Sequence, residues 1–459
     1  MVLNKKLADN TLILTAASLF MSAVSMVFQS RLAARVGTAG MGLYQLVSSV
    51  TALVMAFAIS GIRFASTRLI SEELAAGGES VRGAMGRCFA YALFFGSAAG
   101  AVLFLTAEPI GFLWLGDART VRPLRLSSLS MPCAALCSAM SGYFIAVGRV
   151  WKSALIHIAE LLTGVAVSMS LLSHCPLENI EKSCFAVTQG RVTADIFSLF
   201  LMTAAFLADI RLYTPGTRKL SVTPRLLKIA LPFAFSGYTR SALSTLQHIL
   251  VPRGLRASGL SGEKALSGYG VIHGMALPAV LFPACVLSAA AELIVPELTA
   301  MQLSGDRDGI DRSISRYFSR TLAFSGGVSL LLFLFSDKIG CAVFKSEEAG
   351  QYIRLLSPLV PVMYTDMIVD GCLKGLGEQM WNMKVNLLDS ALSVLLVWRF
   401  LSVYALKAYI AIICFTEILN FVLSYGRLAA ITRRSPASGA GASRRPGEAE
   451  AKCAYKGDT

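Results

Sequence analysis

The sequence predicts an all-α polytopic membrane protein with about twelve transmembrane helices, arranged as two parallel six-helix lobes around a central cavity. The first observation behind this fold class is composition: 55% of the 459 residues are hydrophobic and only 15% are charged, whereas soluble domains carry about 25% charged residues. The second is that apolar residues gather in uncharged runs such as 90–105, as membrane helices require. The third is an internal repeat of the chain.

We expect twelve membrane spans, because a bilayer core requires about 20 mostly apolar residues per helix. They lie at 11–30, 41–61, 88–107, 126–147, 153–173, 185–207, 228–250, 266–291, 319–336, 353–373, 380–398 and 404–426. The first ten residues are polar, and no cleavage site follows the first apolar block, so we expect no signal peptide. Residues 432–459 are rich in Gly, Pro and basic side chains, which predicts a disordered basic cytoplasmic tail.

The net charge of +14 is interpreted as an orientation signal. In a soluble protein such an excess would suggest a nucleic-acid partner, but here the basic residues lie in short clusters between hydrophobic blocks. With the N-terminus inside, the inside segments hold 26 Lys and Arg residues and the outside loops hold 13. This bias predicts a multi-pass protein of a bacterial cell membrane with both termini cytoplasmic, and no nucleic-acid partner.

The ten cysteines form no metal-binding pattern, since the sequence contains no CxxC and no Cys/His cluster. Cys175 and Cys184 flank a polar segment that this topology places outside, where an oxidising compartment would allow a disulfide. HExxH, GxSxG and P-loop motifs are also missing from the sequence. We therefore expect neither an enzyme nor a bound metal or cofactor.

The chain repeats itself at an offset of 229 residues. Segment 87–165 aligns with 316–394 without a gap and gives 16 identities in 79 positions. A six-helix unit ends on the side of the membrane where it began, so both units cross in the same direction. We expect an N-terminal lobe over 1–210 and a C-terminal lobe over 211–431, related by an axis along the membrane normal as in many secondary transporters.

Acidic residues inside the predicted spans are candidate coupling sites, because each costs at least about 2.5–3.5 kcal/mol in a bilayer core. They are the repeat-equivalent Glu160 and Asp389, the pair Asp366 and Asp370, and the single acids Asp195 and Glu417. Repeat equivalence places Glu160 and Asp389 at matching depths, and a spacing of four places Asp366 and Asp370 on one helix face. These acids would bind H⁺ or Na⁺; the alternative is that they pair within their own lobe and only hold helices together.

Arginines in the spans are the candidate anion-binding residues. Arg240 lies near the middle of its span and needs a carboxylate or an anionic ligand. Arg31, Arg63 and Arg253 lie at or just beyond the ends of spans. Guanidinium groups bind phosphate oxygens in a bidentate fork, which favours a cavity for a phosphate or diphosphate. The alternative for the three end residues is that they only extend to the lipid headgroups.

Several segments resemble the stage V sporulation protein B family. They are GTAGMGLYQL at 37–46, ISGIRFASTRLISEE at 59–73, and SGYGVIHGMALP at 267–278 followed by IVPEL at 294–298. That family belongs to the polysaccharide-exporter branch of the multidrug/oligosaccharidyl-lipid/polysaccharide (MOP) flippase superfamily, which is related to lipid II flippases and MATE transporters.

The resemblance implies a two-lobed transporter that moves an undecaprenyl-diphosphate-linked saccharide, such as a peptidoglycan or spore-cortex precursor, from the inner to the outer leaflet. In the related lipid II flippases, arginines in helices 1 and 2 and in the second lobe bind the diphosphate; the nearest positions here are Arg31, Arg63, Arg240 and Arg253. Relatives often carry two more helices for the lipid tail. Expected partners are the lipid-linked saccharide, membrane lipids, H⁺ or Na⁺ and wall-synthesis enzymes, with the chain a monomer.

Three other functions stay open at this point. A multidrug or cation antiporter of the same superfamily would use the buried acids for a cationic drug, although the arginines disfavour such cargo. A non-transporting membrane scaffold for wall synthesis would depend on loops and the tail. A membrane glycosyltransferase ranks last, because loops 62–87 and 298–318 leave little room for a catalytic site.

Overall fold

The computed structural model describes residues 2–75, 81–175, 179–211 and 222–433, which are almost entirely helical and contain no strand. The first helices are α1 (Val2–Ile59), α2 (Ile62–Ala75), α3 (Val81–Pro109), α4 (Val121–Ser127), α5 (Ser130–Ala146), α6 (Val150–Ser173) and α7 (Ile180–Ile210). They are followed by α8 (Val222–Ala257), α9 (Gly262–Val271), α10 (Leu277–Leu281), α11 (Cys285–Ser304), α12 (Arg307–Val343), α13 (Glu347–Leu356), α14 (Val360–Gly375) and α15 (Gln379–Arg433). Most of the tail expected to be disordered, 434–459, lies outside the described residues.

Seven helical segments of the described chain are long and apolar enough to cross a membrane, and the bent pair α4–α5 would make an eighth. The segment Ala16–Ala75 has 60 residues, about three times what one span needs. Its backbone breaks at Gly37, and that of α15 breaks at Ala405, both with positive φ. The expected spans 11–30 and 41–61 therefore both lie in α1. The total of twelve spans stays a prediction, while the all-helical membrane fold is confirmed.

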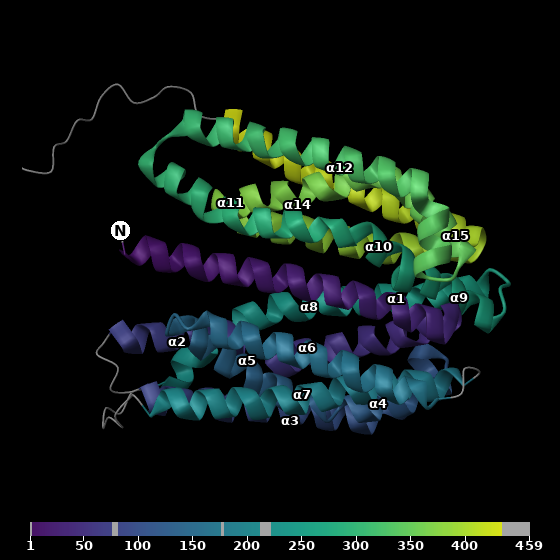
Figure 1. Ribbon diagram of the computed structural model, residues 1–459, viewed down its shortest axis with the longest axis horizontal. Helices are drawn as coiled ribbons and strands as arrows, with labels where there is room; N and C mark the ends of the chain where they lie inside the picture. The colour runs from purple at the N-terminus through teal and green to yellow at the C-terminus, as the bar shows by residue number, and fades with distance from the viewer. Residues whose placement is uncertain (1, 76–80, 176–178, 212–221, 434–459) are drawn as a thin grey trace, which may run out of the picture.

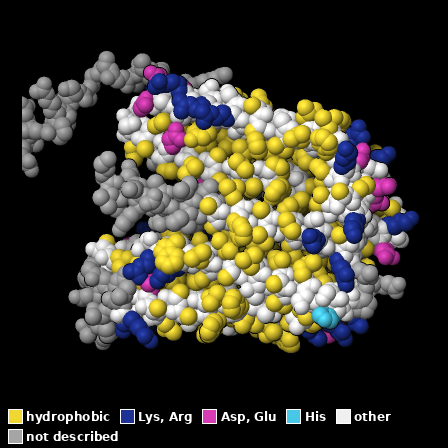
Figure 2. Space-filling view, viewed as in Figure 1, with side chains coloured by type: hydrophobic (Ala, Val, Ile, Leu, Met, Phe, Trp, Pro, Cys, Tyr) yellow, Lys and Arg dark blue, Asp and Glu magenta, His cyan; other side chains and the backbone are white. Residues whose placement is uncertain are grey.

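The helices form two groups that lie one above the other in Figure 1. Helices α2 to α7 occupy the lower group, α10 to α15 occupy the upper group, and α1 and α8 run between them. The predicted lobe boundary at 210 and 211 adjoins 212–221, which the structure does not describe, so the division stays a prediction. In Figure 2 a belt of hydrophobic side chains lies between two ends where most Lys and Arg side chains gather, as expected for a chain that crosses a bilayer.

The internal repeat appears in the structure as matched contacts. Each copy contains an arginine that pairs with an acid and lies over a phenylalanine ring: Arg125, Glu108 and Phe104 in one copy, Arg354, Asp337 and Phe333 in the other. The ion pairs have N···O distances of 2.7 and 3.8 Å, and the guanidinium carbons lie 5.6 and 4.9 Å from the ring centroids. All six positions are related by the offset of 229 residues, so the repeat extends from sequence to side-chain geometry.

The two groups meet where the second half of α1 crosses α9. A Cβ atom at Gly270 would lie 2.1 Å from the carbonyl oxygen of Thr38, and one at Gly42 would lie 2.2 Å from that of Leu266. The hydroxyl of Ser267 donates to that of Thr38 at 2.6 Å. Only glycine lets two helix backbones approach this closely. The crossing brings together two of the segments singled out in the sequence, 37–46 and 267–278.

Two arginines of α8 reinforce this meeting of the groups. Arg253 donates to the carbonyl of Leu113, and Arg256 donates to the carbonyl of Gly116 at 3.1 Å. Leu113 lies near the end of the π-helical segment η1 (Ile110–Leu115), which continues α3, and Gly116 caps that segment. Carbonyls at the C-terminal end of a helix carry partial negative charge. We call the α1–α9 crossing and these two arginine bonds together the far-end contact, because they lie at the end of the molecule opposite the N-terminus.

Candidate functional site

A polar cavity of about 220 Å³ lies within the first group of helices. Its lining comes from the second half of α1 and from α2, α5, α6 and α7: Met55, Ile59, Arg63, Ala134, Cys137, Ser138, Ser141, His157, Glu160, Arg191, Asp195 and Ser198. The structure thus brings together Arg63, Glu160 and Asp195, three of the residues singled out in the sequence. We call this space the first-lobe cavity.

Close helix packing sets the position of Arg63 in the cavity wall. A Cβ atom at Gly142 would lie 1.9 Å from Ser66 Oγ and 2.6 Å from the carbonyl oxygen of Arg63, so a side chain there would push α5 away from α2. The hydroxyl of Thr67 also donates to the Gly142 carbonyl at 3.1 Å. Glycine at 142 therefore keeps α2 close to α5, with Arg63 one helical turn before Thr67.

Glu160 lies at the centre of a hydrogen-bonded chain that connects three helices. Its Oε2 atom accepts a bond from Ser198 of α7 at 2.7 Å and lies 3.2 Å from Nδ1 of His157. The other ring nitrogen of His157 lies 3.3 Å from the hydroxyl of Ser141 on α5, which lies 3.0 Å from that of Ser153. Such a chain fixes the carboxylate in place, because its hydrogen bonds strengthen one another in a low-dielectric interior.

The remaining charges of the cavity are Asp195, Arg191 and Arg63. Asp195 is 9% exposed, and its Oδ2 atom has no hydrogen-bond partner among the described residues. Arg191 lies one helical turn before Asp195 on α7. Within the described part of the chain, neither arginine forms an ion pair closer than 4.0 Å. The cavity thus presents two guanidinium groups, two carboxylates, one imidazole and several hydroxyls to a ligand.

A second set of acids lies on α14 and α15, away from the first-lobe cavity. Asp366, Asp370, Asp389 and Glu417 are close enough that the last three act electrostatically on the first. One carboxylate oxygen in each of the three aspartates is buried without a hydrogen bond, and no lysine or arginine pairs with any of the four within the described residues. Asp389 therefore does not share the environment of its repeat equivalent Glu160, which is held by hydrogen bonds.

The other predicted arginines lie elsewhere. Arg31 on α1 and Arg240 on α8 are exposed, and neither lines the first-lobe cavity. Arg253 belongs to the far-end contact through its bond to the Leu113 carbonyl. Two cavity residues, His157 and Arg191, were not chosen from the sequence. Their spacing could have revealed them, since His157 precedes Glu160 by three positions and Arg191 precedes Asp195 by four, which places each pair on one helix face.

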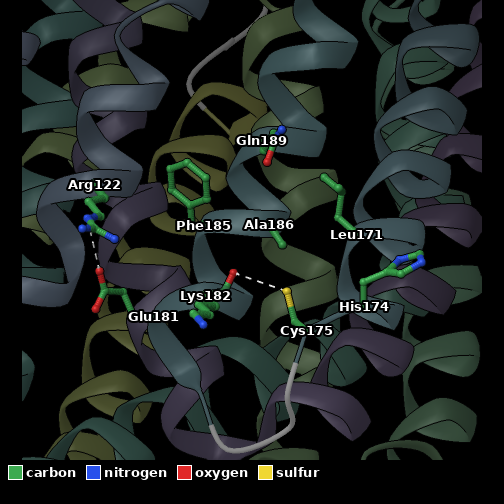
Figure 3. A pocket seen from close by; sticks show the side chains of 9 residues that line it. All are labelled: Arg122, Leu171, His174, Cys175, Glu181, Lys182, Phe185, Ala186 and Gln189. Atoms are coloured by element: carbon green, nitrogen blue, oxygen red, sulfur yellow. Dashed lines mark hydrogen bonds and ion pairs between the residues drawn. The ribbon is translucent and has the colours of Figure 1, made fainter.

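A second cavity of about 300 Å³ lies between α4, α6 and α7 and is shown in Figure 3. Leu171, Phe185 and Ala186 form its apolar part, and Arg122 pairs with Glu181 at its edge at 3.8 Å. The two cysteines considered for a disulfide are free: the thiol of Cys175 lies 3.9 Å from the Lys182 carbonyl, and Cys184 is buried.

Sequence comparisons match this chain to transport-related families. A model of the polysaccharide biosynthesis protein family matches residues 7–291, and a MatE family model matches residues 254–399. Sporulation protein YkvU of Bacillus subtilis (strain 168) is 23% identical over 376 residues, which is 80% of this chain and 82% of that protein. Stage V sporulation protein B of the same organism is 22% identical over 378 residues, 77% of this chain and 70% of that protein.

Solved structures share the fold at low sequence identity. The lipid II flippase MurJ in an inward closed conformation has a TM-score of 0.71 at 13% identity, covering 91% of this chain and 87% of its own. An inward-facing multidrug resistance MATE family transporter of the MOP superfamily has a TM-score of 0.69 at 12% identity, covering 93% and 100%. The first family model spans more than half of the chain. The chain is thus a member of the polysaccharide biosynthesis protein family of membrane transporters, with the MOP-superfamily fold.

Proposed function

We propose that this protein is a flippase that moves an undecaprenyl-diphosphate-linked saccharide from the inner to the outer leaflet of a bacterial membrane by alternating access. The observation that carries the proposal is the first-lobe cavity, which contains Arg63 and Arg191. Neither arginine forms an ion pair within 4.0 Å among the described residues, and Arg191 also acts electrostatically on Glu160 and Asp195. Two guanidinium forks match the oxygens of a diphosphate. The name of the structural relative MurJ, a lipid II flippase, and that of the matching family agree with such a cargo.

The size of the cavity limits what it holds. A volume of about 220 Å³ is below the roughly 300–1,000 Å³ of sites for drug-sized ligands. The cavity therefore receives the diphosphate, while the saccharide and the polyprenyl tail lie outside it. In this arrangement the arginines keep the diphosphate charge out of the hydrocarbon, where an unpaired charge would be strongly unfavourable.

The direction of transport follows from the predicted topology. The excess of Lys and Arg on one side predicts that both termini are cytoplasmic, and in that topology the far-end contact lies at the outer side. With that contact formed, the cargo enters from the cytoplasmic side. Breaking the contact would then open the outer side, as alternating access requires. In this scheme Arg253 holds the outer side closed, and Arg31 and Arg240 are exposed residues that meet the cargo outside the cavity.

The buried acids are the proposed coupling sites for H⁺ or Na⁺. Glu160 lies beside the cargo arginines and within a hydrogen-bonded chain, so a proton on its carboxylate changes the charge that a diphosphate meets. Asp195 lines the same cavity. In the other group of helices Asp366, Asp370 and Asp389 lie together, and no ion pair within 4.0 Å joins them to a lysine or arginine of the described residues; Lys374 acts on Asp370 only from a longer distance. This excess of carboxylates favours cation binding there.

That acidic set also favours a second candidate function, a multidrug or cation antiporter. A cationic drug would bind the acids of α14 and α15, and the MatE model covers most of this region. The two functions differ in which charges recognise the cargo: the arginines of the first-lobe cavity or the acids of the second set.

Ligand-induced thermal stabilisation of the purified protein separates these functions. We expect undecaprenyl diphosphate to stabilise the wild type, and undecaprenol, which lacks the diphosphate, to give no shift. The double variant Arg63→Gln, Arg191→Gln should lose the shift, while Arg122→Gln, at the edge of the other cavity, should keep it. Equal shifts with undecaprenol, or stabilisation by a cationic drug alone, would contradict the flippase proposal.

A further inference from the structure

Two of the four histidines of the chain lie in a cluster that the proposed function does not use. His248 on α8 lies 3.0 Å from the hydroxyl of Tyr269 on α9, through its Nδ1 atom. His273, in the π-helical segment η3 (Ile272–Ala276), is hydrogen-bonded through Nε2 to the hydroxyl of Tyr409 on α15. The two imidazole centroids are 4.7 Å apart. We call these four residues the histidine–tyrosine cluster.

The cluster is built for neutral rings. Tyr269 and Tyr409 are 0% exposed, and each phenol completes a hydrogen bond with one imidazole. No carboxylate, lysine or arginine of the described chain acts on either histidine; the groups facing them are each other, the two phenols, and Gln247 beside Tyr409. The imidazoles themselves are half-buried, so a proton added to either ring would create a largely desolvated cation without a counter-charge among the described residues, which is unfavourable.

The position of the cluster connects it to the far-end contact. Tyr269 and His273 flank Gly270, whose backbone touches α1. The side-chain amide of Gln45 on α1 donates to the carbonyl of His273 at 3.5 Å, and Gly274 packs against the side chain of Met41. A π-helical segment interrupts the regular hydrogen bonds of a helix and occurs frequently at functional sites. Any displacement of the His273 ring would therefore move the part of the helix that holds α1.

We propose that the histidine–tyrosine cluster is a proton-binding site that controls the far-end contact. When His248 and His273 are neutral, the cluster is fully hydrogen-bonded and η3 stays packed against α1. When either ring takes up a proton, the charged ring favours a state in which water reaches it, and the far-end contact opens. This inference rests on the alternating-access part of the proposed function, and it does not depend on the identity of the cargo.

The size of the effect follows from proton linkage. An imidazole in water has a pKa of about 6.5. If the open state hydrates a histidine and the closed state keeps it neutral, lowering the pH from about 7.5 to about 5.5 raises the open-to-closed ratio about tenfold for each histidine. Low pH thus favours opening of the far-end contact. In the predicted topology this contact lies at the outer side, which is the acidic side when a proton gradient drives a secondary transporter.

Distance measurement by pulsed electron paramagnetic resonance tests the proposal. Spin labels would be attached at Ala118 and Lys264, two exposed positions at the far end, in full-length protein whose other cysteines are replaced, reconstituted in nanodiscs without cargo. We expect a longer-distance population that grows at least tenfold between pH 7.5 and pH 5.5. The double variant His248→Gln, His273→Gln should lose this pH dependence. The matched variant His174→Gln, an exposed histidine outside the cluster, should keep it.

The single variant Tyr269→Phe provides a second readout in case the double variant does not fold. It removes one hydrogen bond of the neutral state and keeps the ring, so the opening curve should move to higher pH. A wild type without pH-dependent opening, a double variant with unchanged pH dependence, or an unmoved curve in Tyr269→Phe would overturn the proposal. The measurement contains no cargo, so its result can be interpreted even if the flippase proposal is wrong.

Discussion

The substitution Gly270→Ala should open the far-end contact. Its new Cβ atom would lie 2.1 Å from the Thr38 carbonyl oxygen, 2.5 Å from the Gly42 nitrogen and 2.9 Å from the Gly42 Cα. All three are backbone atoms of α1, so no side chain can rotate away to make room. The helices must separate until the contact reaches an ordinary van der Waals distance, and the bond between Ser267 and Thr38 is lost with it.

This geometry sets the expected change in the ratio of closed to open molecules. Overpacking of a well-packed interior costs about 1–3 kcal/mol, and three backbone clashes place this case at the upper end. Alanine regains up to about 1 kcal/mol through its helix propensity in both the closed and the open state, so that gain cancels in their ratio. A net shift of about 2–3 kcal/mol against the closed state is a change of roughly 30- to 150-fold in the ratio.

The spin-label distance between Ala118 and Lys264 at pH 7.5 measures this ratio directly. The control is Gly326→Ala on α12, where an added Cβ meets no atom within 4 Å. The control should leave the distance distribution unchanged and raise the unfolding temperature slightly, because alanine favours helix. If Gly270→Ala shows the same closed population as Gly326→Ala, the role assigned to the α1–α9 crossing is wrong.

Three further predictions concern stability and thiol chemistry. Asp209 is 2% exposed and pairs with both Arg149 and Lys152; Asp209→Ala should lower the free energy of unfolding by about 3 kcal/mol, measured by denaturant titration in detergent. Arg125→Ala breaks a half-exposed ion pair and should lower the free energy of unfolding by less than about 1 kcal/mol. A loss as large as that of Asp209→Ala would contradict the expectation that the buried pair contributes more than the exposed one. Cys175 should react with maleimide without prior reduction, detected by mass spectrometry; labelling only after reduction would show that it forms a disulfide.

The sequence was most informative about features that depend on composition and local spacing alone. Long uncharged runs predicted the helical membrane fold. The repeat at an offset of 229 residues was visible in the sequence, and the structure adds the matched contacts around Arg125 and Arg354. The glycines of 37–46 and 267–278 were visible as motifs, but not their mutual contact. Which helix crosses which depends on packing between residues 228 positions apart, and no local pattern records that.

The charged residues show the same limit. Glu160 was identified as a deep acid, but its partner Ser198 lies on the next helix, and only the fold brings the two together. Arg253 was grouped with anion-binding arginines because it is a cation near the end of a span. In the structure its partner is the backbone carbonyl of Leu113. Every residue has a backbone carbonyl, so the sequence does not indicate which one will accept such a bond. Asp389 and Glu160 occupy equivalent positions of the repeat, but their surroundings in the structure differ.

The most direct test of the central claim is transbilayer movement of a lipid-linked saccharide. Purified protein would be reconstituted into vesicles containing fluorescent undecaprenyl-diphosphate-linked saccharide, and a membrane-impermeant quencher would report the fraction in the outer leaflet. We expect faster exchange than in empty vesicles. We also expect a loss of at least about tenfold in Arg63→Gln, Arg191→Gln, since hydrogen bonds to charged groups contribute about 1.5–3 kcal/mol each, and no loss in Arg122→Gln. Exchange equal to that of empty vesicles, or full exchange in the double variant, would contradict the central claim.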